Sequence, residues 1–107
     1  MKVGIIGLGR MGKIFAREFN KRYSVIFFDP GVKEDKSLRR VDSLEEIAKQ
    51  SDVVIIATPL GKVPEIAREV GEIVRRNRKK EKIIFDIASL KKEVIKVYRD
   101  YPRSVRV

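Results

Sequence analysis

Three glycines with GxGxxG spacing are the residues best suited to chemistry, and they lie in the segment Gly7-Leu8-Gly9-Arg10-Met11-Gly12. In this pattern Gly7 would permit a tight turn, Gly9 would let a diphosphate approach the backbone, and Gly12 would let a helix pack closely on a strand. The diphosphate would bind free N–H groups at the helix N-terminus, where the helix dipole favours anions. The segment therefore predicts a dinucleotide-binding loop, provided that it joins a strand to a helix.

An acidic residue follows at the spacing that such a loop requires. Asp29 lies 22 positions after Gly7, close to the separation of about 20 residues at which an acid binds the adenosine ribose. Its carboxylate would accept hydrogen bonds from the ribose hydroxyls and repel a 2′-phosphate, so the sequence favours NAD, with NADP as the alternative. An Asp before Pro30-Gly31 also suits a simple turn. Basic residues of the next loop could still allow NADP to bind, namely Lys33, Lys36, Arg39 and Arg40.

Two later apolar runs end in polar residues that could complete a site. Thr58 and Pro59 follow one run, and Ser89 and Lys91 follow the other. Because ligands bind at the carboxyl ends of strands in open α/β sheets, we expect Thr58 and Ser89 to bond the ribose or carboxamide of the cofactor. Lys91 would attract an anionic substrate. Each has a plain alternative: a turn at Thr58-Pro59, a helix cap at Ser89 and a solvated side chain at Lys91.

The elements that must position these residues alternate along the chain. Continuous apolar runs predict strands that are covered on both faces, at residues 3–6, 25–28, 53–57 and 83–87. Weaker edge strands are predicted around Val41 and at residues 105–107, and helical spacing predicts helices at residues 11–19, 43–49, 64–74 and 89–98. This order predicts an α/β, Rossmann-type fold, with a doubly wound, mainly parallel sheet and helices on both faces. We expect a single dinucleotide-binding domain over residues 1–107.

Composition narrows the classes of function. The 107 residues include no Cys and no His, which excludes a disulfide framework and thiolate catalysis and argues against a metal site. No apolar run is long enough to cross a bilayer, and we expect a cytoplasmic protein without a membrane partner. The net charge of +10 is densest at residues 75–80, but no aromatic residue is interleaved there. We therefore expect a small anionic substrate and no specific nucleic acid partner.

The same residues carry a resemblance to a known family. The glycine segment, Ala57-Thr58-Pro59 and the segment from Asp86 to Lys91 together resemble the cofactor domain of prephenate dehydrogenases. The resemblance implies oxidation of prephenate or arogenate with NAD or NADP and loss of CO2. It also implies a catalytic and substrate-binding position for Ser89 near the nicotinamide, and a ribose-binding role for Asp29. Leu90 stands where the family usually has valine.

The carboxyl end departs from this resemblance. The family places a His-Pro motif and a helical domain after its last cofactor-domain strand, whereas this sequence has no histidine and stops at Val107. We therefore expect a cofactor domain that is incomplete as an enzyme, with a separate or missing helical domain as its partner. Two alternatives stay open. One is a non-catalytic module that senses NAD(H), and the other is the cofactor domain of a β-hydroxyacid dehydrogenase, whose glycine motif is similar.

Overall fold

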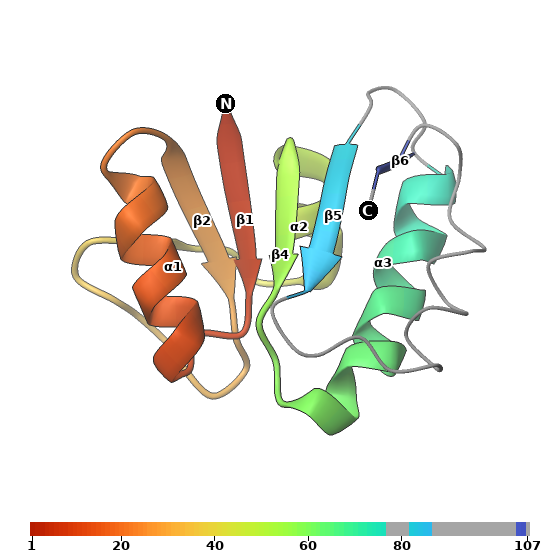
Figure 1. Ribbon diagram of the computed structural model, residues 1–107, viewed down its shortest axis with the longest axis horizontal. Helices are drawn as coiled ribbons and strands as arrows, with labels where there is room; N and C mark the ends of the chain where they lie inside the picture. The colour runs from red at the N-terminus through yellow and green to blue at the C-terminus, as the bar shows by residue number, and fades with distance from the viewer. Residues whose placement is uncertain (77–81, 87–104, 107) are drawn as a thin grey trace.

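A six-stranded sheet forms the centre of the computed structural model, which describes residues 1–76, 82–86 and 105–106 (Figure 1). The strand order is β3-β2-β1-β4-β5-β6, and every described pair of neighbouring strands is parallel. The strands are β1 (Lys2–Ile6), β2 (Ser24–Phe28), β3 (Arg39–Arg40), β4 (Val53–Ile56), β5 (Lys82–Asp86) and β6 (Val105–Arg106). The order reverses at β1, as in the doubly wound dinucleotide-binding fold. The predicted fold class is confirmed.

Helices cover both faces of this sheet. They are α1 (Arg10–Asn20), α2 (Leu44–Gln50) and α3 (Val63–Arg76), with a 3₁₀ turn η1 (Leu60–Lys62) before α3. Figure 1 shows α1 in front of β1 and β2, and α2 behind the sheet. The parallel strands bring their carboxyl ends to one edge, where α1 also begins. Any residue that follows β1, β2 or β4 directly is therefore at this edge.

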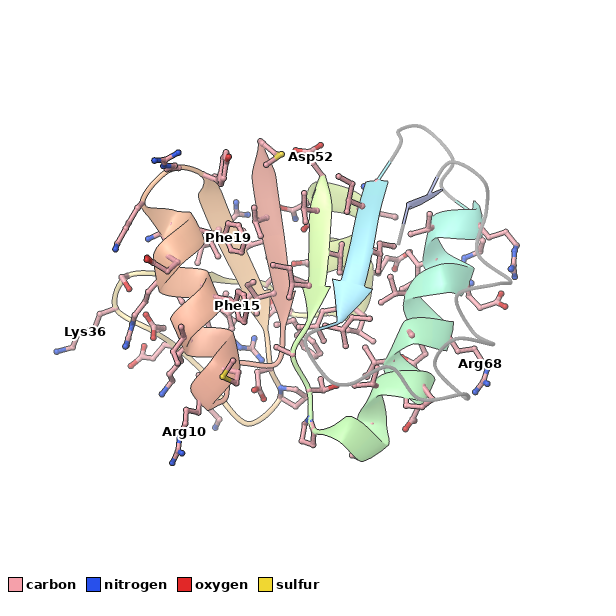
Figure 2. The ribbon with its side chains drawn as sticks, viewed as in Figure 1. Arg10, Phe15, Phe19, Lys36, Asp52 and Arg68 are labelled. Atoms are coloured by element: carbon pink, nitrogen blue, oxygen red, sulfur yellow. The ribbon has the colours of Figure 1, made fainter. Side chains whose placement is uncertain are left out.

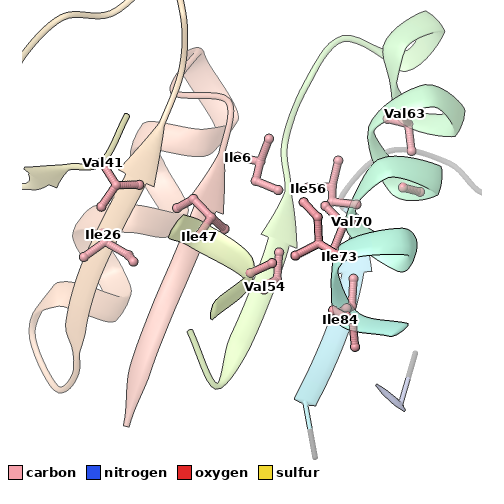
Figure 3. Close-up of a cluster of buried hydrophobic side chains, with 13 residues drawn as sticks. Ile6, Ile26, Val41, Ile47, Val54, Ile56, Val63, Val70, Ile73 and Ile84 are labelled. Carbon is pink, nitrogen blue, oxygen red and sulfur yellow. The ribbon is translucent and has the colours of Figure 1, made fainter. Parts of the chain in front are cut away.

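Two apolar cores, one on each face, hold the layers together. Figure 3 shows the core under α2 and α3, where Ile6 and Ile56 of the sheet meet Ile47, Val70 and Ile73 of the helices. The core on the α1 side contains Ile5, which is fully buried and directly precedes Ile6 in the sequence. Successive strand residues point to opposite faces, so an uninterrupted apolar run serves both cores at once. The loops at the carboxyl edge are thus anchored on a rigid sheet.

The short helix α2 begins with a side-chain cap, for which Ser43 and Glu46 stand at the required spacing. Ser43 Oγ accepts a hydrogen bond from the Glu46 N–H at 3.1 Å. The Glu46 carboxylate accepts from the N–H of Asp42 at 3.2 Å, one residue before the position that a standard capping box would use. These two bonds fix the segment that leads from β3 into α2.

Helix α3 continues through Arg76, whereas the sequence predicted a basic connection from Arg75 onward. Arg75 Nη1 lies 3.1 Å from Glu72 Oε1, one turn earlier on the helix. Basic residues are also favoured in the last turn by the helix dipole. Both effects extend the helix beyond its last buried residue, Val74.

The packing of α1 does not follow the apolar spacing of its sequence, which predicts that Met11 and Ile14 share one core-facing side with Phe15 and Phe19. The exposed fractions of Met11 and Ile14 are 50% and 53%. The buried residues of α1 are Gly12 and Ala16, which bring the helix backbone close to the sheet. Phe15 and Phe19 lie beside this contact and point toward the sheet (Figure 2). Small residues thus set a narrow contact and leave the larger apolar side chains on its flank.

The two predicted edge strands are present as β3 and β6. The helix predicted at residues 89–98 lies outside the described residues. In the part of the chain that is described, no helix combines the length and the apolar character that a membrane span needs.

Candidate functional site

The loop between β1 and α1 turns sharply at Gly7. This residue has φ of 95°, a region that side-chain-bearing residues rarely adopt. Its N–H donates to the Phe28 carbonyl oxygen at 2.9 Å, which ties the loop to the end of β2. A Cβ at Gly7 would lie 2.9 Å from the carbonyl carbon and oxygen of Ala57. Both the backbone angle and the neighbouring strand therefore require glycine here.

Gly12 and Gly9 have opposite surroundings. A Cβ at Gly12 would collide with the carbonyl oxygen of Gly7, so α1 lies directly against the loop. A Cβ at Gly9 would meet no atom of the described residues within 4 Å. Gly9 is exposed and has extended backbone, with φ of −80° and ψ of −160°. The chain itself fills the space around Gly12 and leaves the space at Gly9 open.

The open space at Gly9 faces the N-terminus of α1. The first N–H groups of a helix have no acceptor within the helix, and Gly9 supplies no side-chain cap. The first turn of α1 contains no acidic residue. Arg10 is exposed and points away from the body of the molecule (Figure 2). Free donors, the helix dipole and a nearby cation together make this end of α1 favourable for a diphosphate.

Asp29 connects the glycine loop to the loop after β2. Its Oδ2 accepts from the Leu8 N–H at 2.7 Å, and its Oδ1 accepts from the Gly31 N–H at 2.8 Å. The second bond is the turn that the sequence left open as an alternative. The first bond is long-range and could not be read from the sequence. Each carboxylate oxygen can accept a further hydrogen bond, so neither contact prevents Asp29 from binding ribose hydroxyls.

A cavity of about 330 Å³ opens next to Asp29 at the carboxyl edge of the sheet. The residues that line it come from the ends of β1, β2 and β4 and from the start of α3. They are Ile6, Gly7, Phe28, Asp29, Pro30, Gly31, Thr58, Pro59, Lys62, Glu65 and Ile66. Thr58 Oγ1 is buried and has no hydrogen-bond partner among the described residues. A buried hydroxyl without a partner is unusual, and Thr58 is one of the residues that line the cavity.

The structure adds residues that the sequence analysis missed. Ile6 and Phe28 give the cavity apolar walls, and Lys62, Glu65 and Ile66 line it from η1 and α3. The signal that could have found the last three is their position in the first turns after β4. A helix that starts at the carboxyl edge brings its opening residues to the site.

The basic residues of the β2–β3 loop and of β3 do not line this cavity. They are Lys33, Lys36, Arg39 and Arg40. The Arg40 guanidinium is held by the Val32 carbonyl oxygen and by Asp42. In the same loop, the hydrogen bond from the Ser37 N–H to the carboxylate of Asp35 lowers the pKa of Asp35, against the opposing effect of burial.

The predicted residues Ser89 and Lys91 lie outside the described residues, so the structure does not place them. Strand β5 ends at Asp86, which pairs with Ile56 at the end of β4. Within the described part of the chain, no group of three or more metal-ligating side chains comes together.

These features fit an adenine dinucleotide. The space at Gly9 leaves room for a diphosphate, Asp29 offers acceptors for ribose hydroxyls, and Thr58 lines the cavity next to Asp29. The apolar side chains of Phe28 and Ile66 suit a planar base. Fold and site together define an NAD-binding domain of the Rossmann type.

The family is shown by the sequence. The family model described as "D-isomer specific 2-hydroxyacid dehydrogenase, NAD binding domain" matches residues 1–81. The chain therefore belongs to this family of NAD-binding domains. Among curated proteins, none matches the chain.

Solved structures with this fold come from several dehydrogenases. Prephenate dehydrogenase from A. aeolicus, solved with hydroxyphenyl propionate and NAD+, has a TM-score of 0.72 and 19% identity, covering 97% of this chain and 39% of its own. D-2-hydroxyisocaproate dehydrogenase has a TM-score of 0.69 and 23% identity, covering 97% and 32%. NAD-dependent formate dehydrogenase from Staphylococcus aureus, solved with NAD, has a TM-score of 0.68 and 18% identity, covering 97% and 32%. This chain thus spans between a third and two fifths of these enzymes, and the likeness concerns the fold.

Proposed function

We propose that the glycine segment and the N-terminus of α1 hold the diphosphate of NAD. Gly9 lets the diphosphate approach, and the free N–H groups of Arg10, Met11 and Gly12 donate to it. The Leu8 N–H is already engaged by Asp29, so Leu8 contributes by fixing the loop against the end of β2. The observation that carries this proposal is the open space at Gly9 beside the start of α1.

Asp29 and the β4 loop hold the rest of the cofactor in this proposal. The Asp29 carboxylate accepts hydrogen bonds from the adenosine ribose, and the apolar side chains of Phe28 and Ile66 flank the adenine. Thr58 Oγ1 bonds the cofactor where Pro59 turns the chain away from β4. Support comes from the shared cavity that these residues line and from the buried Thr58 hydroxyl, for which the described residues supply no hydrogen-bond partner.

The chemistry is hydride transfer. NAD, when bound, supplies a nicotinamide ring that accepts a hydride from an alcohol carbon. The residues of this chain contribute orientation, because a rigid sheet edge holds the cofactor at a fixed position relative to the substrate. Ser89 and Lys91 follow β5 in the sequence and are proposed to contact a small anionic substrate.

For the substrate, we propose a prephenate-type hydroxy acid, oxidised with loss of CO2. The Ser89 and Lys91 motif supports this choice, together with the fold shared with a prephenate dehydrogenase. A D-2-hydroxy acid is the second candidate, and the family match over residues 1–81 favours it. For the prephenate-type substrate, the resemblance implies that a separate helical domain completes the substrate site. This chain covers 39% of the prephenate dehydrogenase and 32% of the D-2-hydroxyisocaproate dehydrogenase.

Two measurements test the proposal. Calorimetric titration with NAD and NADP tests binding, and absence of binding to either at millimolar concentration would refute it. NADH formation is then followed with prephenate and with a panel of D-2-hydroxy acids, by the chain alone and after a prephenate dehydrogenase helical domain is joined to it. Turnover of prephenate by the joined protein supports the first substrate, and turnover of D-2-hydroxy acids alone supports the second. NAD binding without turnover in any form would instead support a sensing module.

A further inference from the structure

Among the described residues, the lining of the cavity beside Asp29 is acidic close to where the adenosine ribose is proposed to bind. It contains two carboxylates, those of Asp29 and Glu65, and one amine, that of Lys62, on the wall that η1 and α3 contribute. A 2′-phosphate needs a cation on the β2 side of the cavity, next to Asp29. Four cations follow β2 in the sequence, but none of them lines the cavity: Lys33 and Lys36 of the β2–β3 loop, and Arg39 and Arg40 of β3.

Among these four cations, Arg40 of β3 contacts a residue of the cavity wall. Its guanidinium carbon lies 5.8 Å from the centroid of the Phe28 ring, and Phe28 lines the cavity. Nε of Arg40 donates to the Val32 carbonyl oxygen at 3.0 Å, and Nη1 donates to Asp42 Oδ1 at 2.7 Å. The Arg40 side chain is only 24% exposed. Arg40 is therefore held against the ring of Phe28, a residue that lines the cavity, while Arg40 itself does not line it.

Asp42 is itself fixed in place. Its N–H donates to Glu46 Oε2 at 3.2 Å, as part of the capped start of α2. Its carboxylate faces solvent, with 87% of the side chain exposed, so its replacement leaves the core intact. An Arg–carboxylate pair of this kind sets the direction of the guanidinium even where its contribution to stability is small.

We infer that Asp42 is a positioning residue for cofactor choice, because it holds Arg40 away from the place that a 2′-phosphate would occupy. This inference rests on the proposed role of Asp29 in ribose binding. With Arg40 engaged, the β2 side of the cavity presents the Asp29 carboxylate to the ribose, which suits the free 2′-hydroxyl of NAD. Without Asp42, Arg40 keeps a single backbone acceptor, and its long side chain can reorient around Phe28 toward a 2′-phosphate.

The test is the ratio of the NADP and NAD dissociation constants, measured by calorimetry for the whole chain. Asp42→Asn keeps the N–H bond to Glu46 and removes the charge, and it is expected to shift the ratio about tenfold toward NADP. Glu45→Gln is the matched control, since it removes a carboxylate of α2 that pairs with Lys49. It is expected to leave the ratio unchanged. The double variant Asp42→Asn/Arg40→Gln is expected to lose the gain in NADP affinity.

The outcomes separate this inference from the proposed function. A ratio for Asp42→Asn equal to that for Glu45→Gln would overturn the role of Asp42, and a gain that persists without Arg40 would overturn the role of Arg40. Asp42→Ser serves as a second charge-removing variant, with thermal melting to check that each variant folds. If the unaltered chain binds neither NAD nor NADP, the proposed function fails and this inference with it. NAD binding with an unshifted ratio refutes the inference alone.

Discussion

Gly9→Ala separates the binding role of the glycine loop from its structural role. The added Cβ meets no described atom within 4 Å, and the extended backbone at Gly9 is accessible to alanine. Two small effects on stability oppose each other. Alanine restricts the unfolded chain, which stabilises by about 0.4–1 kcal/mol, and it is a poorer N-cap than glycine by a similar amount. We expect the free energy of unfolding to change by less than about 0.5 kcal/mol, and therefore a shift of only a few degrees in Tm.

The effect on NAD binding should be much larger. The new methyl group lies where the diphosphate approaches the N-terminus of α1, so the diphosphate moves away from its donors. Loss of one or two hydrogen bonds to a charged group costs about 1.5–3 kcal/mol each, and each 1.4 kcal/mol is about a tenfold loss of affinity. We expect NAD to bind Gly9→Ala at least about tenfold more weakly.

Gly61→Ala is the matched control for this experiment. A Cβ at Gly61 also meets no atom of the described residues within 4 Å, and Gly61 is not among the described residues that line the cavity. We expect unchanged NAD affinity and slightly higher stability. Calorimetric titration gives the affinities, and urea unfolding gives the stabilities. Unchanged NAD affinity in Gly9→Ala would refute the role of Gly9, and equal weakening in both variants would show that the effect is not local.

Three further substitutions test other parts of the account. Gly12→Ala places a Cβ against the carbonyl oxygen of Gly7. Because the backbone must shift, we expect the free energy of unfolding in urea to fall by about 1–3 kcal/mol and NAD to bind more weakly. An unaltered unfolding curve would contradict this close contact. Asp29→Ser should weaken NAD and relieve the exclusion of NADP in competitive titrations, and an unchanged preference would leave Asp29 as a turn residue only. Asp35 has a lowered pKa because the Ser37 N–H bonds its carboxylate. Its stabilising effect is therefore present above the ordinary value of 3.8 and is lost as pH falls through the lower folded value. The acid limb of the stability profile should be flatter in Asp35→Asn, and superimposable profiles would contradict the assignment.

The sheet could be predicted because its central strands are continuous apolar runs. This pattern is typical of parallel strands that are buried on both faces, and it can be recognised in each strand separately. The cap of α2 was also readable, since Ser43 and Glu46 stand at the required spacing. The sequence did not show which side of α1 faces the sheet. Hydrophobic periodicity placed Met11 and Ile14 in the core, whereas the contact is set by Gly12, the smallest residue of the helix.

The residues of the site that follow a local sequence pattern could be predicted, whereas the contacts between residues far apart in the sequence could not. The sequence gives the glycine spacing and an acid 22 positions beyond Gly7. It does not show that the Asp29 carboxylate joins the Leu8 and Gly31 N–H groups, because this contact depends on how two loops meet at the sheet edge. Likewise, Glu65 reaches the cavity through the placement of α3, which only the fold determines.

Amide NMR during a titration with NAD tests the central claim most directly, because it reports binding residue by residue. We predict that the largest shifts fall on the N–H groups of Gly9, Arg10, Met11 and Gly12, with further shifts at Gly31 and Thr58. They should follow one saturable, one-to-one curve. Saturable shifts that leave the start of α1 and the Asp29 loop unaffected, or no shifts at millimolar NAD, would contradict the claim that this edge of the sheet holds the dinucleotide.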